Sequence, residues 1–302
     1  KELVEISDIF TPNKVGRLNT RVISSKKPFN IGDIKITPYL VDHSGFDALA
    51  FLIEAEGKRL FYSGDFRGHG RKSSLFKAIL RNPPENIDCL LMEGTSLGRA
   101  DKSCKDEDEV EEKIKGILEN SSNVTFLFAS SQNIDRLVSA YRACLRTNSI
   151  FVIDIYTAYV LDKLRKISKN IPQFNWKNVR VKFYRNQAEI FAKKVSSKLL
   201  YYYNTRKIEI FEIEKKRNKI LMLARDNAIF PNIIKNVGNI EGAKIIYSMW
   251  DGYLKPEFEE YCAKRGIAIE KAHTSGHADL ADLEDFAKAL SPKALIPIHT
   301  FH

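Results

Sequence analysis

Residues 34–65, IKITPYLVDHSGFDALAFLIEAEGKRLFYSGD, decide how the chain is expected to fold. The stretch contains three segments rich in β-branched and aromatic residues, at 34–41, 48–54 and 58–62, and short turns separate them. This pattern predicts three strands, with a hairpin turn around Gly57. If the three strands run antiparallel, the first and third point the same way. Their ends then lie at one edge of the sheet, roughly 10 Å apart.

Polar side chains that can bind metal follow the ends of these strands. His43 comes after the first strand and Asp65 after the third, while Glu93 and His299 each follow a further apolar segment. The carboxyl ends of strands are where α/β sheets usually place ligands. Imidazole and carboxylate suit zinc, and a carboxylate can bridge two metals. One such residue alone is more often a turn residue, so only the four together predict a metal site.

Outside this stretch, strands and helices alternate along the chain. Helices are expected at 74–81, 106–119, 135–146, 158–169, 187–203 and 280–290. Strands are expected at 87–92, 124–129, 150–153, 179–183, 219–224, 244–247, 267–270 and 294–298. Such alternation predicts an α/β fold with a parallel sheet flanked by helices.

The composition excludes several classes of protein. Apolar residues make up 44% of the chain, and no apolar run approaches the roughly 18 residues of a membrane span. The first residues are charged, which argues against a signal peptide. Four cysteines lie far apart with no CxxC pair, so neither a disulfide framework nor a thiolate zinc site is expected. We therefore expect a cytoplasmic protein with no membrane partner.

Positive charge is concentrated in the middle of the chain. Residues 121–250 contain 23 lysines and arginines against 9 aspartates and glutamates, a net charge of +14, while the rest of the chain has a net charge of −4. A basic excess in one region favours a surface for a polyanion such as nucleic acid. The alternative is a solvated basic face with no partner.

The six histidines avoid this basic region. All of them lie before residue 70 or after residue 272, at His43, His69, His273, His277, His299 and His302. A metal site built from the two ends of the chain, around an insertion without ligands, would give this distribution, and so could chance. His69 and His302 are expected at the surface.

Five motifs occur in a fixed order: DHS at 42–44, SGDF at 63–66, MEGT at 92–95, HTSGHA at 273–278 and PIH at 297–299. In this order they resemble the β-CASP metallo-β-lactamase nucleases, and among them the ribonuclease J type. The resemblance spans residues 41–299. It implies an α/β fold: a metallo-β-lactamase αββα sandwich, incomplete at its N-terminus, formed by residues 1–120 and 251–302. A β-CASP parallel-sheet α/β domain would be inserted at 121–250.

The resemblance also implies roles for individual residues. It implies a site for two zinc ions, or Mn²⁺ in their place, with the ligands His43, Asp65 and His299. Asp65 would bridge the two ions. The implied catalytic residues are Asp65, Glu93 and His277. Glu93 would orient a histidine, and His277 would act as general acid or contact the scissile phosphate. A phosphate-binding turn would be lined by His273, Ser275 and Gly276.

A second substrate contact is expected in ASSQNIDR at 129–136. Relatives carry a Ser/Asn loop here that holds an RNA phosphate, which implies Ser130, Ser131 and Asn133 as substrate-binding residues. The free N–H groups at a helix start bind anions well, and the segment reads as a strand running into a helix. The alternative is a simple N-cap, since serine and asparagine are also the best capping residues.

One family motif is absent. The HxHxDH motif, which in this family supplies the remaining zinc ligands and a base, should lie upstream of His43, and the 42 preceding residues contain no histidine. The chain also does not begin with Met. We expect that an N-terminal part is missing from the sequence, with a degenerate family member as the alternative.

The expected function is a zinc-dependent ribonuclease that hydrolyses phosphodiester bonds through a two-metal hydroxide. Its substrate would be single-stranded RNA, with DNA as an alternative. Tyr184, Tyr201, Tyr202 and Tyr203 could stack on bases, although core packing is the commoner role. The sequence leaves open a homodimer and the choice between exonuclease and endonuclease. Two other functions stay open, a non-catalytic RNA-binding scaffold and a small-molecule metallohydrolase, and the basic insertion and HTSGHA argue against the latter.

Overall fold

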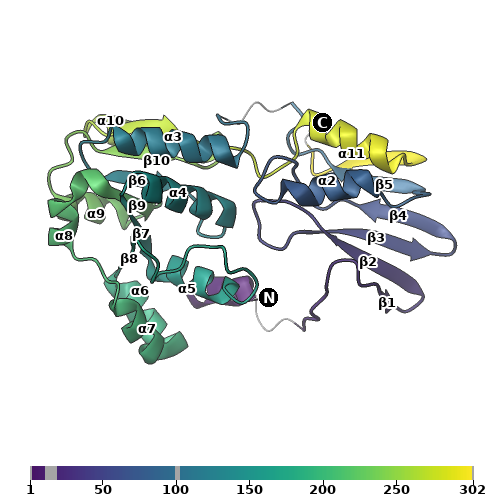
Figure 1. The fold of residues 1–302 in the computed structure, drawn as a ribbon, viewed down its shortest axis with the longest axis horizontal. Coiled ribbons are helices and arrows are strands. Elements are labelled where there is room, and N and C mark those ends of the chain that lie inside the picture. The colour runs from purple at the N-terminus through teal and green to yellow at the C-terminus, as the bar shows by residue number, and fades with distance from the viewer. Residues whose placement is uncertain (1, 11–18, 99–102, 301–302) are drawn as a thin grey trace. The chain divides into compact units, whose positions relative to one another are not determined.

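The computed structural model describes residues 2–10, 19–98 and 103–300, and it divides into two compact units. We call residues 20–107 and 274–302 the meander unit, and residues 1–19 and 108–273 the parallel unit. Each unit is built around one six-stranded sheet (Figure 1).

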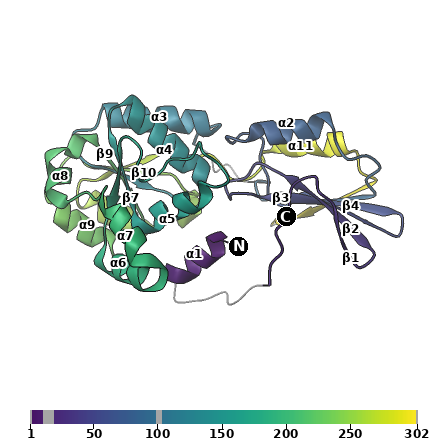
Figure 2. The ribbon, with the colours of Figure 1, turned by 60° about the horizontal axis from the view of Figure 1, so that its bottom comes forward.

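The meander unit contains the strands predicted from residues 34–65. Its sheet has the order β1-β2-β3-β4-β5-β12. The strands are β1 (Phe29–Ile31), β2 (Ile34–Leu40), β3 (Leu49–Ala55), β4 (Lys58–Tyr62), β5 (Cys89–Glu93) and β12 (Ala294–Ile298). Helices α2 (Ser73–Arg81) and α11 (Leu280–Leu290) lie side by side on one face of this sheet (Figures 1 and 2).

Strand direction in this sheet brings four strand ends to one edge. β2 pairs antiparallel with β3, and β3 pairs antiparallel with β4. β4, β5 and β12 then run parallel to one another. β2, β4, β5 and β12 therefore all point the same way, as the predicted meander requires.

Aromatic packing fixes the two helices on the sheet. The ring of Phe66, just after β4, lies 4.5 Å from that of Phe286 on α11 and 5.8 Å from that of Phe76 on α2, measured between centroids. All three side chains are buried. Because large aromatic side chains contribute much of the apolar burial, this cluster holds both helices beside the loop that carries Asp65.

The parallel unit has a sheet of order β11-β10-β6-β9-β7-β8 in which every pair is parallel. Its strands are β6 (Thr125–Phe128), β7 (Ile150–Asp154), β8 (Val179–Lys182), β9 (Ile220–Ala224), β10 (Lys244–Tyr247) and β11 (Ala268–Lys271). The α-helices are α1 (Glu2–Phe10), α3 (Glu107–Glu119), α4 (Ile134–Arg146), α5 (Ile155–Leu164), α6 (Arg185–Phe191), α7 (Ser197–Asn204), α8 (Ile210–Lys215), α9 (Phe230–Val237) and α10 (Pro256–Ala263). The described residues also include a π-helical segment, η1 (Ala192–Ser196), and two 3-10 helices, η2 (Arg217–Lys219) and η3 (Asp251–Tyr253).

The two faces of this sheet are covered by different helices. Residues of α8, α9 and α10 form one core cluster with β6, β9 and β10. Helices α3 and α4 lie on the side away from α8 and α9 (Figure 2). All residues of β6 and β9 are buried, as expected for central parallel strands covered on both faces.

The connections reverse direction between β6 and β9. The chain leaves β6 through α4 and passes β9 to reach β7, whereas it leaves β9 through α9 and passes β6 to reach β10. Right-handed crossovers place two such helices on opposite faces of the sheet. The carboxyl ends of β6 and β9 therefore flank a topological switch point, where α/β sheets commonly bind ligands.

The α/β class and most predicted elements are confirmed, but some expectations differ from the structure. The helix expected at 187–203 is divided into α6, η1 and α7. The parallel unit is larger than 121–250, because β11 pairs with β10 and α1 contacts α5. The described part of the meander unit has one six-stranded sheet, and the αββα sandwich, which was expected to be incomplete at its N-terminus, stays a prediction. In the ranges that the structure describes, no helix has the length and apolar character needed to cross a membrane.

A buried arginine ties together the loops at the sheet edge of the meander unit. Arg67 is fully buried, and its Nη1 donates to the backbone oxygen of Ser275 at 2.9 Å. Its Nε lies 3.4 Å from Oδ1 of Asp42, and Nη1 lies 3.5 Å from Oε1 of Glu107. One guanidinium thus links segments more than 200 residues apart in sequence, and its carboxylate partners compensate for the loss of water.

We expect Arg67→Met to destabilise the protein by about 3–5 kcal/mol, because the substitution removes the buried guanidinium that lies against the carboxylates of Asp42 and Glu107. Urea denaturation followed by circular dichroism measures this change. Arg81→Met is the matched control, since Arg81 is exposed at the end of α2 in the same unit and should cost less than about 1 kcal/mol. Equal destabilisation by both substitutions would contradict the role of Arg67.

Candidate metal centre and phosphate loop

Three of the predicted site residues converge at the carboxyl edge of the meander sheet. Asp65 follows β4, His299 follows β12, and His277 lies in the loop before α11. One ligand atom from each of the three lies within 4.8 Å of the other two. Nδ1 of His299 is 3.1 Å from Oδ1 of Asp65. His299 has a φ of 56°, in the left-handed region that non-glycine residues seldom adopt and that is common at functional sites.

The carboxylate of Glu93 forms a hydrogen bond with the imidazole of His277. Its side chain is 1% exposed, and Oε2 lies 2.8 Å from Nδ1 of His277. The other oxygen, Oε1, accepts the backbone N–H of Phe66 at 2.6 Å. One carboxylate therefore fixes both the imidazole of His277 and the loop that carries Asp65. The orienting role expected for Glu93 would act through this contact, and it stays a prediction.

His43 lies beside the cluster formed by Asp65, His277 and His299. Its ring centroid is 5.1 Å from that of His277, and its Nδ1 lies 2.5 Å from the backbone oxygen of Gly276. Burial lowers the pKa of His43, and the neighbouring His277 lowers it further. The neutral imidazole, which is the form that binds metals, is therefore favoured at this position.

Glycine is required at two places around these side chains. Gly64, in the SGDF motif, has a φ of 56°, and a Cβ there would lie 2.6 Å from the backbone oxygen of Leu49. Gly276, in the HTSGHA motif, has no room for a Cβ because Ser44 lies against it. Both motif glycines thus allow the close approach of backbone segments that brings the histidines and Asp65 together.

His69 was expected at the surface, and that expectation is wrong. Its side chain is 12% exposed, with Nδ1 3.3 Å from Oδ2 of Asp282 and Nε2 3.2 Å from the backbone oxygen of Ser275. Asp282 also accepts the N–H of Gly68 at 2.8 Å, and Asp279 caps α11 through the N–H of Asp282. The trio His69, Asp279 and Asp282 could hold a cation. The hydrogen bonds of these three residues instead link the loop after β4 to the start of α11.

The implied phosphate-binding turn is divided between the two units. Ser275 is buried and its Oγ accepts the N–H of His277 at 3.1 Å, while Gly276 contacts His43. His273 is half-buried at the end of the parallel unit, after β11. His302 lies outside the described residues. A shared anion site for His273, Ser275 and Gly276 stays a prediction.

The donor set at the sheet edge fits zinc. Two imidazoles and a carboxylate are the ligands that catalytic zinc sites use, and such sites keep an open position for water or substrate. The buried carboxylate of Glu93 behind His277 is the outer support that metal-binding histidines normally have. His43, with its neutral imidazole favoured, is a further nitrogen donor beside them.

The Ser/Asn loop of the parallel unit lies at the switch point, between β6 and α4. Asn133 caps α4, and its side chain accepts the N–H of Arg136 at 3.2 Å. Ser130 is exposed and its Oγ accepts the N–H of Gln132. Ser131 is buried, and its Oγ lies 2.7 Å from Oγ1 of Thr157. The role of Asn133 is therefore explained by helix capping. Ser131 does not cap the helix, and its contacts lie elsewhere.

Ser131 contacts Arg225, a residue that the sequence analysis did not identify. Arg225 follows β9, donates to Ser131 Oγ, and lies 3.0 Å from Oδ2 of Asp154 at the end of β7. Burial would raise the pKa of Asp154, but Arg225 and the hydrogen bonds from Thr157 outweigh it, so the pKa is lowered. The ion pair is therefore formed at neutral pH. Its position directly after an apolar strand was the signal in the sequence that could have identified Arg225.

Known proteins resemble the chain in one segment of its sequence and in its fold. Residues 264–300 match the model of the family RMMBL, the Zn-dependent metallo-hydrolase RNA specificity domain, and the matched segment includes His277 and His299. The chain is similar in fold to a protein of unknown function from Enterococcus faecalis V583, known from a crystal structure, with a TM-score of 0.75 and 20% sequence identity over 99% of this chain and 68% of that chain. No curated protein matches the chain. The matched segment indicates a zinc-dependent metallo-hydrolase related to RNA.

Proposed function

We propose that the chain belongs to a zinc-dependent ribonuclease of the β-CASP metallo-β-lactamase type, similar to ribonuclease J, that hydrolyses RNA phosphodiester bonds. The observation that carries this proposal is the convergence of Asp65, His277 and His299, whose ligand atoms lie within 4.8 Å of one another. The match of residues 264–300 to the RNA specificity domain supports the same conclusion.

The side chains divide into holding and positioning roles. Asp65 and His299 would hold the metal together with His43 or His277, and a bound zinc would lower the pKa of a ligated water and offset phosphate charge. Glu93 keeps the ring of His277 in one orientation. His277 then presents Nε2 either to the metal or to a phosphate oxygen, where a protonated nitrogen can donate to the leaving 3′ oxygen.

The parallel unit would bind the RNA strand. Residues 121–250 carry a net charge of +14, and all of them lie within this unit. Ser131 and Arg225 lie at its switch point, where a hydroxyl beside a guanidinium suits a phosphate. Contacts of this kind give binding that weakens as salt rises. Single-stranded RNA in the cytoplasm is the proposed substrate, with DNA as an alternative.

One observation favours a second function, a non-catalytic RNA-binding scaffold. The chain contains no HxHxDH motif, so the cluster supplies fewer ligands than the two-metal site implied by the resemblance. A scaffold would bind RNA with the same basic unit and would not cleave it.

We expect Asp65→Ala to lower the cleavage of a single-stranded RNA oligonucleotide by more than about 100-fold in the presence of zinc or manganese, because the substitution removes a ligand that nothing else in the cluster replaces. Asp33→Ala is the matched control, since Asp33 is exposed in the turn between β1 and β2 and should leave cleavage unchanged. Gel electrophoresis of end-labelled RNA measures both.

Equal cleavage by the two variants would reject the metal assignment. Absence of cleavage by the unsubstituted chain, with RNA binding intact, would replace the nuclease by the scaffold.

We expect Ser131→Ala to weaken RNA binding about fivefold, because Arg225 loses a partner that orients its guanidinium at the switch point. Ser139→Ala is the control, since Ser139 is also buried on α4 and its Oγ donates to the backbone oxygen of Asp135 one turn earlier in the same helix. Fluorescence anisotropy at several salt concentrations measures both. Identical affinities across that range would remove the phosphate loop from the proposal.

A further inference from the structure

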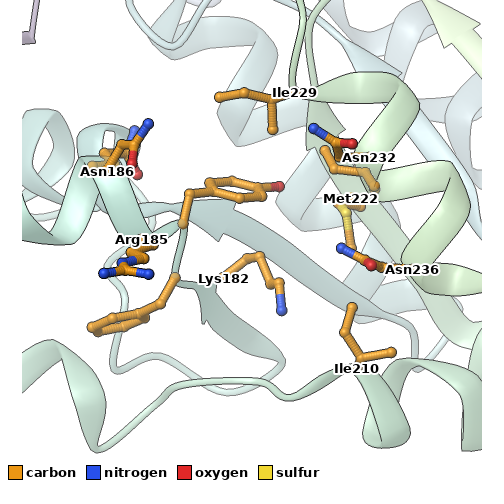
Figure 3. Close-up of a pocket in the computed structure, with 12 residues that line it drawn as sticks. Lys182, Arg185, Asn186, Ile210, Met222, Ile229, Asn232 and Asn236 are labelled. Atoms are coloured by element: carbon orange, nitrogen blue, oxygen red, sulfur yellow. The ribbon is translucent and has the colours of Figure 1, made fainter.

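The parallel unit contains a pocket that none of the roles above uses. Its volume is about 430 Å³, within the range of roughly 300–1,000 Å³ typical of ligand sites. The residues that line it come from the end of β8, the start of α6, the start of α8 and the length of α9 (Figure 3). They are Lys182, Phe183, Tyr184, Arg185, Asn186, Gln187, Ile210, Met222, Ile229, Asn232, Ile233 and Asn236.

The lining combines a mostly apolar wall with a small set of polar groups. Phe183 and Tyr184 supply aromatic rings, and the rest of the apolar wall comes from Ile210, Met222, Ile229 and Ile233. Asn232 and Asn236 lie on one side of the pocket, and Arg185 and Asn186 on the opposite side (Figure 3). A flat apolar ligand with polar edges is the kind of molecule that such a wall accepts.

The polar groups narrow the choice of ligand. Within the described residues, Asn186, Asn232 and Asn236 are exposed and their side chains make no hydrogen bond to the protein. Asparagine amides pair with the edge of adenine, donating to N7 and accepting from N6. Lys182 and Arg185 add positive charge, and the lining contains no carboxylate. These features favour an anion that carries a nucleobase over a metal cation or an apolar peptide.

Two further observations concern the position of the pocket and its preference for an anion. Gln187 lines the pocket and also donates to Asp154 at 3.1 Å, so the pocket shares a residue with the Ser131–Arg225–Asp154 cluster. Burial lowers the pKa of Lys182, although Glu209 opposes the shift. A partly dehydrated ammonium gains more from an anionic partner than one in bulk water does.

We propose that this pocket binds an unpaired adenine nucleotide, with the base between the aromatic and asparagine side chains and its phosphate at Lys182 and Arg185. The base can come from an RNA strand or from a free mononucleotide. The proposal rests on the proposed ribonuclease function only for the choice between these two sources.

The test uses the whole chain carrying Asp65→Ala, so that binding is separated from cleavage. AMP is titrated calorimetrically, and a fluorescent single-stranded oligoadenylate is titrated by anisotropy. Asn232→Leu places an apolar side chain of similar size in the pocket, and it should weaken AMP binding at least about fivefold. Asn204→Leu, on the exposed end of α7 outside the pocket, is its control.

A second pair of variants tests the phosphate contact. Lys182→Met should reduce the slope of log K for oligonucleotide binding, plotted against log salt concentration, by about 0.7. Lys235→Met removes the same charge from an exposed position on α9 outside the pocket lining, and it should change AMP binding less than twofold.

The results distinguish a base of an RNA strand from a free mononucleotide as the ligand. Weakening of AMP and oligonucleotide together supports a base of the RNA strand, and weakening of AMP alone supports a free nucleotide. No AMP binding, or equal effects of pocket and control variants, overturns the proposal. A failed metal assignment would leave the AMP titrations unchanged, because AMP has no internucleotide bond that the chain could cleave.

Discussion

The common direction of β2, β4, β5 and β12 is the constraint on which the metal site depends. Each strand delivers its following residues to the same edge, so Asp65 after β4 and His299 after β12 can meet although 234 residues separate them. A one-residue slip of β12 against β5 would turn its side chains to the other face. The parallel register of Ile298 opposite Glu93 prevents this displacement at the point where His299 begins.

Buried polar groups then hold the loops that follow these strands. Glu93 fixes His277 and the backbone at Phe66, and Arg67 joins Asp42 to Ser275. Burying these charged groups is costly, and apolar side chains of the same shape often give a more stable protein. The presence of the charged groups at the sheet edge is explained if the site needs the loops in one specific arrangement. The aromatic core below could not enforce that arrangement, because apolar contacts are not directional.

Much of this arrangement could be predicted because it depends on local patterns. The strand segments, their turns and the polar residues at their ends gave the meander and placed Asp65 and His299 at one edge. The limits of the parallel unit could not be predicted in this way, since β11 joins it through pairing with β10. Helices α9 and α10 were missed although proline in the first turn of each is a helix-start signal. Arg67 was missed because its partners are distant in sequence, and nothing local distinguishes a buried arginine from an exposed one. Arg225 was missed although its position directly after an apolar strand was a local signal.

The central claim is that one edge of the meander sheet is a zinc site, and zinc binding tests it most directly. The chain, freed of metal and titrated with zinc against a chromophoric chelator, should bind zinc, and X-ray absorption should show imidazole nitrogen among the ligands. Replacing His277 and His299 together by alanine should abolish this binding, while His69→Ala should leave it intact, because His69 belongs to the tie with Asp282. Equal zinc affinity in the unsubstituted chain and in the double variant would contradict the account.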